Sequence, residues 1–421
     1  MAKTSRIIGG QGLAGADALR ALACLGVYLA HAGHNLAGHS RLLDELAAKA
    51  GNLGVACFFV LSGFLLAQPF WKAFRHGQTM PDLRVYAVRR LGRIVPGYVV
   101  CLLLTWIISA QWHGALDWGR LLTSLTFTNS WLAGTFAPPW DGPLWSIGVE
   151  MNFYALLALV ALGLFRFRSV AAARTYILVI IALLALGHLA LMQSGPVLEQ
   201  WVANPFLFEA GAWGLPRNPL SLFAHFLVGV LAADVYVSLA ARPAPPAAPP
   251  GWLTRTGLNR FDIAALVLIV VLVGFIDGTV LDHLPVVWRY RYLWRVPGFL
   301  YNWPGYQIMV GMLLVSLALS QRIGTALDNR FLRLTAMLSF GIYMWHYPII
   351  SWIDCWFAQR HETGTAAGLT SFVLALALTY VVAYLSYRYV EMPVLQMAHR
   401  YRPPVGSRAR PDLPRSLRPR A

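Results

Sequence analysis

Charged residues are scarce in this chain. Asp, Glu, Lys and Arg make up 12% of the 421 residues, whereas apolar residues make up 57%. A typical soluble domain has about 25% charged residues, and a chain with so few could not cover its surface with polar groups. The shortage of charge therefore excludes an ordinary soluble protein. The 16 tryptophans agree with this, because aromatic rings gather where a membrane meets water.

Cysteine is also rare. The four cysteines lie in or beside apolar segments, at Cys24, Cys57, Cys101 and Cys355, and none belongs to a CxxC pair. No histidine stands at metal-ligand spacing from any of them. Thiols in such surroundings behave as small buried hydrophobes, so we expect buried thiols and no metal site.

Acidic residues are few relative to basic ones. There are 18 Asp and Glu against 34 Lys and Arg, which gives a net charge of +16. Such a charge can indicate nucleic-acid binding, but these basic residues cluster between apolar runs and at the two ends of the chain. The aromatic and basic platform that single strands need is also missing. We therefore expect no nucleic-acid partner.

Long apolar runs are abundant, and they decide the fold class. Ten segments are each close to the ~20 residues that a helix needs to cross a bilayer. They lie at residues 16–35, 52–70, 94–110, 144–165, 175–193, 220–240, 262–279, 304–320, 334–353 and 367–387. The third is short and could begin within the basic stretch before it. Because a backbone in lipid must satisfy its own hydrogen bonds, we predict an all-α, polytopic transmembrane bundle of about ten spans.

The distribution of basic residues predicts the orientation of these spans. With both termini in the cytoplasm, the cytoplasmic side holds 25 of the 34 Lys and Arg and the opposite side holds eight. This asymmetry follows the positive-inside rule. We therefore predict cytoplasmic termini and direct contact with membrane lipid.

The chain reads as one membrane domain, from residue 1 to residue 398. We find no internal repeat and expect no appended soluble domain. The stretch RPAPPAAPPG predicts a cytoplasmic linker at 241–260, since proline breaks regular helix. Residues 399–421 are rich in Pro and Arg and have nothing to bury, so we predict a disordered, basic, cytoplasmic tail.

Two ionisable residues in the first span are candidates for chemistry, because charge at membrane depth is costly. Arg20 and His31 are separated by 11 residues, which places them within ~20° of one helical face and roughly 16–17 Å apart. Arginine keeps its charge and needs an anion, such as the phosphates of a donor from the cytosol. A neutral histidine could accept a proton from a hydroxyl. Two alternatives remain: Asp17 could pair with Arg20, and His31 could be a structural core residue.

Five further motifs occur in order along the spans. They are GVACFFVLSGF at 54–64, RRLGRIVP at 89–96, PLWSIGVEMNFY at 143–154, GIYMWHYP at 341–348 and RYVEMP at 388–393. The first places small residues among aromatic ones and suits close helix packing. In the third, Ser146 and Glu150 are one turn apart and share a helical face.

With these motifs in this order, the sequence resembles the acyltransferase-3 family of bacterial-type membrane acyltransferases over essentially the whole chain. The family's Arg–ten residues–His signature matches Arg20 and His31. Its FFxxSGF, RRxxRxxP and PLWSxxxE elements match residues 58–64, 89–96 and 143–150. Its closing Tyr/His and Arg/Glu-Pro elements match Tyr343, His346, Arg388, Glu391 and Pro393.

The resemblance implies transfer of an acyl group, commonly acetyl, from acyl-CoA on the cytoplasmic side. Acceptors in the family are usually sugars of surface polysaccharides, glycolipids or peptidoglycan, and the implied location is the bacterial inner membrane. The chain departs from the family at Gly148, where serine is common. It departs again at Met151 and Asn152, where a second acidic residue and glutamine are frequent. These departures concern the handling of the acceptor.

Both lines of reasoning give one hypothetical mechanism. Arg20, with Arg93, holds the donor phosphates; His31 is the general base; and Glu150 orients or charge-balances that histidine. Ser62 and Ser146 could donate hydrogen bonds near the thioester, or they could simply pack helices or bond to backbone carbonyls. The remaining candidates for substrate contact or site support are Tyr154, Tyr343 and His346. Arg388 and Glu391 are expected to form a structural pair at the cytoplasmic interface.

A transporter or flippase of a glycolipid or small polar molecule is the competing interpretation, because it shares the spans and the buried charges. Inverted repeats or paired broken helices would favour it, and the sequence displays neither.

Overall fold

Most of the part of the chain that the computed structural model describes is helical. That part comprises residue 13, residues 15–33, residue 35 and residues 41–113, 117–138, 140–202, 217–242, 258–276, 303–361 and 364–402. It contains no β-strand. The predicted all-α class is therefore confirmed.

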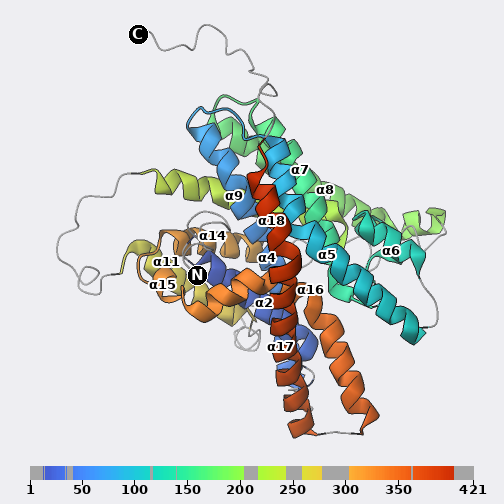
Figure 1. Cartoon of the computed structure of the whole chain (residues 1–421). Helices are drawn as coiled ribbons and strands as arrows, with labels where there is room; N and C mark the ends of the chain where they lie inside the picture. Colours follow the sequence, from blue (N-terminus) through green and yellow to red (C-terminus); the bar gives the residue numbers. More distant parts are fainter. Residues whose placement is uncertain are drawn as a thin grey trace, which may run out of the picture.

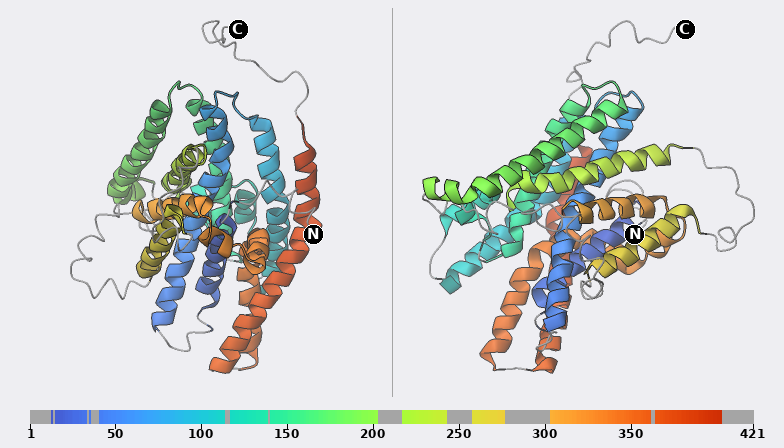
Figure 2. Two further views of the ribbon diagram at one scale, coloured as in Figure 1. Left: turned by 90° about the vertical axis from the view of Figure 1, so that its left-hand side faces the viewer. Right: turned by 180° about the vertical axis from the view of Figure 1, so that it is seen from behind.

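Each of the ten predicted spans coincides with a helix (Figures 1 and 2). These helices are α2 (Ala16–Ala32), α4 (Arg41–Arg75), α5 (Leu83–His113), α7 (Trp145–Leu164), α8 (Val170–Val202), α9 (Pro219–Ala240), α11 (Arg260–Ile276), α14 (Gly305–Leu319), α16 (Arg330–Gln359) and α17 (Thr365–Ser386). Several run well past the apolar segment, because helix continues into the polar flanks where nothing interrupts it. Thus α5 begins within the basic stretch, which is the alternative that the short third segment left open.

Shorter elements join these helices. They are α6 (Trp118–Leu125), three 3₁₀ turns η1 (Asn129–Trp131), η2 (Ala133–Thr135) and η3 (Gly142–Leu144), α15 (Ile323–Ala326), a π turn η5 (Tyr387–Glu391) and α18 (Met392–Arg400). Because α18 runs to Arg400, the predicted tail begins inside a helix. Residues 403–421 and most of the predicted linker, residues 243–257, lie outside the described part of the chain.

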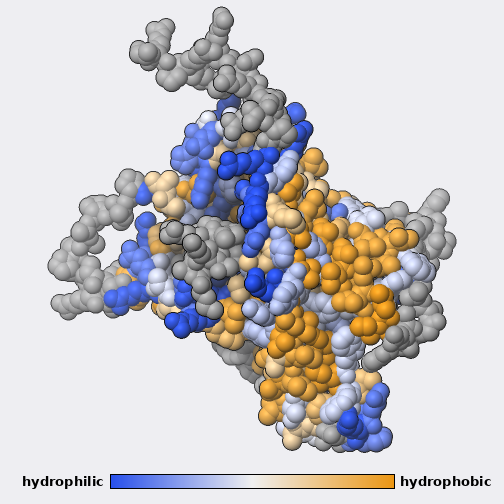
Figure 3. Space-filling view, in the orientation of Figure 1, coloured by the Kyte–Doolittle hydropathy of each residue, from blue (hydrophilic) through white to orange (hydrophobic). Residues whose placement is uncertain are grey.

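Six helical stretches in the described part are long and apolar enough to cross a membrane. They are Asp44–Arg75, Leu83–Ser109, Gly142–Leu164, Val170–Ser194, Pro219–Ala240 and Thr365–Arg400. Helices α2, α11 and α14 have 17 residues or fewer, and α16 is less apolar. Large aliphatic side chains stay exposed on the outside, for example Val270 at 70%. Hydrophobic residues accordingly cover much of the right and lower parts of the face in Figure 3. The chain is a multi-pass integral membrane protein.

The helices α2, α4 and α9 form the centre of the molecule, with α4 packed between the other two. Small residues allow these close contacts, as the motif at 54–64 predicted. A Cβ on Gly54 would lie 2.5 Å from the carbonyl oxygen of Ala23 in α2, and one on Gly63 would overlap the carbonyl oxygen of Phe226 in α9. Helix α16 packs on α2 and forms an antiparallel hairpin with α17 (Figure 1).

Two buried carboxylates form ion pairs that tie helices together at the ends that carry the basic clusters. Asp234 of α9 is buried and binds Arg75 of α4 and Arg174 of α8. Glu391, also buried, pairs with Arg93 of α5 at 3.4 Å. The predicted pair between Arg388 and Glu391 is wrong, because the described residues show the carboxylate turned toward α5 at the π turn and no ion pair to Arg388.

Candidate active site

Helix α2 carries the first two candidate residues at its opposite ends. Arg20 lies in the second turn, and its guanidinium is 3.8 Å from the Asp17 carboxylate. Both side chains are partly exposed, at 31% and 39%, and such a pair contributes little stability in water-accessible surroundings. The alternative that Asp17 pairs with Arg20 is therefore correct. The pair still leaves other N–H groups of the Arg20 guanidinium available to an anion.

At the other end of α2, His31 meets His346 of α16. Nδ1 of His31 is 3.0 Å from Nε2 of His346, and it is also 3.0 Å from the Val27 carbonyl oxygen one turn back. Nδ1 of His346 is 3.1 Å from the Ile342 carbonyl oxygen. His346 is 1% exposed, whereas His31 is half-buried. The two histidines thus form a pair in which only His31 retains accessible surface.

A tyrosine and a serine continue the polar contacts from this pair. The hydroxyl groups of Tyr343 and Ser146 are 2.6 Å apart, which joins α16 to the first turn of α7. The Tyr343 ring lies 5.8 Å from the His346 ring and packs edge-on against Phe58 of α4 at the same distance. Phe58 belongs to the motif that also carries Ser62. Tyr343 therefore connects three of the sequence motifs.

Glu150 lies one turn beyond Ser146 on α7 and receives two hydroxyl donors. Ser62 of α4 donates to its Oε1 at 2.9 Å, and Tyr154 donates to the same oxygen at 2.7 Å. Ser62 and Glu150 are half-buried, whereas Val149 and Phe153 beside Glu150 are fully buried. Both hydroxyl donors converge on one carboxylate oxygen, and among the described residues no hydrogen bond to Oε2 is found.

The predicted residues therefore form two adjoining groups. One joins Ser62, Glu150 and Tyr154, and the other joins Ser146, Tyr343 and the two histidines. The single turn of α7 between Ser146 and Glu150 connects them. The expected contact between Glu150 and His31 is not found in the described part of the chain, where His346 is the side chain that touches His31. Sequence spacing could not reveal this, because the two histidines are 315 residues apart.

Arg93 lies beside this region rather than within its hydrogen bonds. Its ion pair with Glu391 leaves it 23% exposed, and its guanidinium also faces the Phe340 ring of α16 at 5.8 Å. The sequence motifs alone had placed Arg93 with Arg20 at the donor phosphates. In the structure Arg93 packs against α16 at Phe340, which is three residues before Tyr343.

The departures from the family pattern on α7 have a local structural cause. A Cβ on Gly148 would lie 2.5 Å from the Oδ1 of Asn129, so glycine leaves room for the buried Asn129 side chain of η1. Asn152 donates to the Phe127 carbonyl at 2.9 Å and accepts from the Trp131 indole at 3.1 Å. Both positions thus hold the segment 127–136 against the first turns of α7.

One buried acid near the site lies outside the matched motifs. The Asp141 side chain is 0% exposed, and the Cys101 thiol at 3.6 Å is its only side-chain partner among the described residues. It lies in the connection before α7, next to the backbone of α16 that Cys101 also contacts at Met344. Burial raises the pKa of the Asp141 carboxyl well above its usual range. A single Asp between a proline pair, a tryptophan and a glycine gave no sequence signal for burial.

The four cysteines are free, and Cys24, Cys57 and Cys101 are buried as predicted, whereas Cys355 is only half-buried because it lies near the end of α16. In the described residues no group of three His, Cys, Asp or Glu could hold a metal ion.

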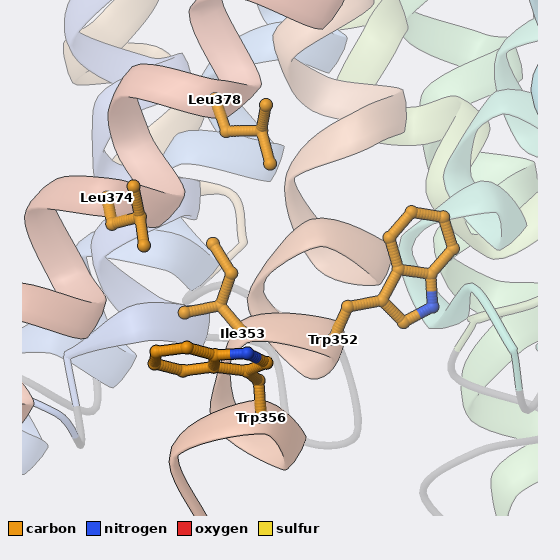
Figure 4. A pocket seen from close by; sticks show the side chains of 5 residues that line it. All are labelled: Trp352, Ile353, Trp356, Leu374 and Leu378. Carbon is orange, nitrogen blue, oxygen red and sulfur yellow. The ribbon is translucent and has the colours of Figure 1, made fainter.

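An apolar recess of about 340 Å³ lies between α16 and α17 and is lined by Trp352, Ile353, Trp356, Leu374 and Leu378 (Figure 4). It contains none of the candidate residues, so it belongs to the apolar outer surface.

Comparison with known proteins gives a family and distant relatives. The Acyl_transf_3 model, described as an acyltransferase domain, matches residues 13–388. O-acetyltransferase OatA of Staphylococcus aureus (strain NCTC 8325 / PS 47) is 23% identical over an alignment of 402 residues, which covers 91% of this chain and 57% of that protein. Peptidoglycan O-acetyltransferase OatA of Listeria monocytogenes is 23% identical over 403 residues, covering 90% and 55%. The chain thus spans just over half the length of these relatives. No solved structure matches it.

Proposed function

The chain belongs to the acyltransferase family whose domain model it matches over residues 13–388, and we propose that it is a membrane O-acyltransferase. In this proposal it moves an acetyl group from acetyl-CoA to a hydroxyl of an envelope carbohydrate, either a sugar, a glycolipid or a polysaccharide precursor. Because one relative is named a peptidoglycan O-acetyltransferase, peptidoglycan fragments are the first acceptors to test.

The observation that carries the proposal is the convergence of separate motifs on two adjoining polar groups. Side chains from α2, α4, α7 and α16 contact one another through bonds of 2.6–3.0 Å. Burying so many polar groups in a membrane protein is costly unless they are paired. A carboxylate, hydroxyl groups and a half-exposed histidine in one place supply what a hydroxyl acceptor needs.

We further propose ten spans with both termini in the cytoplasm. The basic residues support this orientation, and each predicted span has a helix at its place. Arg20 then lies at the cytoplasmic end of α2, where acyl-CoA would enter, and His31 lies ~16 Å deeper along the helix axis. That separation is similar to the length of a pantetheine arm. In this arrangement Arg20, with Arg93, faces the donor phosphates, and the histidine faces the thioester.

The chemistry follows from these positions. His31 takes the proton of the acceptor hydroxyl while the oxygen of that hydroxyl attacks the thioester carbonyl. The carbon–sulfur bond then breaks, and CoA leaves as a thiol after it takes that proton from His31. Ser62 and Tyr154 hold the Glu150 carboxylate in place through their hydroxyl groups. In this proposal the carboxylate carries a negative charge close to the site. It thereby balances the charge that His31 gains in the transition state.

A direct assay tests this function. The protein is purified, returned to lipid and given acetyl-CoA labelled on the acetyl group, and both CoA release and label transfer to peptidoglycan fragments, other sugars and glycolipids are followed. We expect CoA release that depends on an acceptor and yields a labelled ester. A protein that consumes no acyl-CoA with any acceptor, yet moves a glycolipid unchanged across the bilayer, would instead be a transporter.

Replacing Arg20 by glutamine should raise the KM for acetyl-CoA by about tenfold or more, with a smaller change in kcat. The reason is that a charge-assisted hydrogen bond to a phosphate contributes about 1.5–3 kcal/mol. Steady-state kinetics with varied acetyl-CoA measures the effect.

Asp17→Asn is the matched control for this variant. It removes the only ion pair that Arg20 makes in the described residues, but it leaves the guanidinium in place. Its KM should stay within about twofold of the wild type. If the two variants behave alike, Arg20 serves only as the partner of Asp17 and the donor contact lies elsewhere.

A further inference from the structure

The contacts of the two histidines determine where their hydrogens lie. A carbonyl oxygen only accepts hydrogen bonds, so Nδ1 of His346, at 3.1 Å from the Ile342 carbonyl, carries a hydrogen. By the same reasoning Nδ1 of His31, at 3.0 Å from the Val27 carbonyl, carries one. In a neutral imidazole the second nitrogen then has a lone pair. Nε2 of His346 is therefore an acceptor, and it stands 3.0 Å from the N–H of His31.

The reverse arrangement conflicts with the geometry. If Nε2 of His346 carried a hydrogen, two N–H groups would face each other at 3.0 Å, or the lone pair of His31 would face the Val27 carbonyl oxygen. Placing one hydrogen on Nδ1 of each ring satisfies all three contacts. The unprotonated nitrogen of neutral His31 is then Nε2.

Aromatic side chains from two helices hold both rings in this orientation. Tyr28 of α2 lies 6.4 Å from the His346 ring, and its hydroxyl is fixed by a 2.7 Å bond to the Phe372 carbonyl of α17. Tyr343 lies 5.8 Å from the same ring, and Tyr347 packs edge-on against the His31 ring at 5.4 Å. These aromatic contacts restrict the rotation of both imidazole rings.

We propose that His346 is a positioning residue that fixes the hydrogen of His31 on Nδ1, so that Nε2 of His31 is the atom that removes the proton from the acceptor hydroxyl. This inference rests on the proposed acyl transfer. His346 itself touches neither substrate and neither gains nor loses a proton during the cycle. When His31 becomes an imidazolium, its Nδ1–H donates more strongly to Nε2 of His346, and this stabilises the transition state.

The proposal assigns each atom in the transfer. The O–H bond of the acceptor breaks and an N–H bond forms at Nε2 of His31. The acceptor oxygen bonds to the acetyl carbon, and the carbon–sulfur bond breaks. The sulfur takes the proton from Nε2, so that an ester and free CoA are formed and His31 returns to its neutral state.

Two substitutions of His346 separate an acceptor role from simple packing. The side-chain oxygen of glutamine reaches the position of Nε2 and can accept from His31, whereas asparagine reaches only as far as Nδ1. His346→Gln should therefore keep kcat within about threefold of the wild type. His346→Asn should lower kcat about ten- to a hundredfold, which is the range for one hydrogen bond to a group that becomes charged. The KM for acetyl-CoA should change little in either variant.

Equal losses in the two variants, or wild-type rates in both, would overturn the assignment. Unfolding temperatures measured in detergent show whether the fold is intact, and both variants bury an amide of the same kind. If His346 had a purely structural role, the two variants would lose activity to the same extent. Their kcat would then not fall selectively while the KM for acetyl-CoA stayed unchanged.

A second measurement does not depend on activity. Solid-state NMR of ¹⁵N-histidine-labelled protein in lipid nanodiscs, compared with a His31→Gln variant, isolates the two ring nitrogens of His31 among the 11 histidines. We expect a protonated Nδ1 and an unprotonated Nε2 in the neutral state. A protonated Nε2 contradicts the inference whether or not transfer occurs. The expected tautomer in a protein that transfers nothing would instead contradict the proposed function and leave the pairing intact.

Discussion

Replacing His31 by alanine should lower the rate of acetyl transfer by about 10²–10⁴-fold, because general-base assistance typically supplies that factor. This is the largest effect on activity that we expect from any single substitution. His31 is the histidine of the pair that retains accessible surface, since its partner His346 is 1% exposed. The measurement is kcat with saturating acetyl-CoA and the acceptor identified in the assay above.

His76→Ala is a suitable control for the loss of a histidine. Like His31, His76 directs Nδ1 to the carbonyl one turn back, in this case that of Lys72 at 2.7 Å, but it lies exposed after the end of α4. Its replacement should leave transfer unchanged. If His31→Ala transfers at the wild-type rate while Glu150→Gln is silent, the base is Glu150 and the histidine pair is structural.

Replacing Gly63 or Gly229 by alanine should destabilise the protein by about 1–3 kcal/mol or more, which is typical of overpacking in a tight core. These two glycines lie where α4 and α9 are closest. A Cβ on Gly63 would overlap the carbonyl oxygen of Phe226, and a Cβ on Gly229 would overlap that of Val60. Neither oxygen can move without its helix, so the two helices must separate.

Separation of α4 and α9 would also displace the site. Ser62 precedes Gly63 directly and donates to Glu150 at 2.9 Å, so a shift of α4 lengthens this bond. We therefore expect the alanine variants to lose activity together with stability. Unfolding temperature in detergent, followed by fluorescence or by loss of the monodisperse peak, measures the first effect, and the acetyl-transfer assay measures the second.

Gly187→Ala provides the matched control on α8. A Cβ there would meet no atom within 4 Å, and alanine favours helix over glycine by about 1 kcal/mol. This variant should be as stable as the wild type or slightly more so. If Gly229→Ala is equally stable, α4 and α9 do not approach each other as closely as the structure has them.

The location of the ten helices could be predicted because the signals are local. An apolar run of ~20 residues makes helix in lipid whatever its neighbours are, since only the segment itself can satisfy its backbone. The same reasoning failed at the helix ends. Helix α4 begins at Arg41, 11 residues before the predicted span, because the polar residues there also favour helix. The length of an apolar run therefore predicts the part of a helix that is buried in the membrane, but it does not predict where the whole helix begins and ends.

The candidate residues could likewise be selected from sequence, but their partners could not. The spacing of Arg20 and His31 placed them on one face of one helix, where Arg20 pairs with Asp17 and His31 meets His346. Glu150 was expected beside His31, yet it lies with Ser62 and Tyr154. Likewise Glu391 was expected to pair with Arg388, three residues before it, and it pairs instead with Arg93, 298 residues away.

The sequence by itself therefore determined that the chain is an all-helical membrane protein, where its helices lie, and which side chains are candidates for acyl-transfer chemistry. Only the tertiary structure decided that His31 meets His346, that Ser146 meets Tyr343, and that Asn129 occupies the space above Gly148. The physical reason is the range of the interactions. A helix forms from hydrogen bonds four residues apart, whereas contacts between helices depend on the rotation, tilt and depth of each helix. These are fixed only when small residues such as Gly63 and Gly229 let the helices pack together.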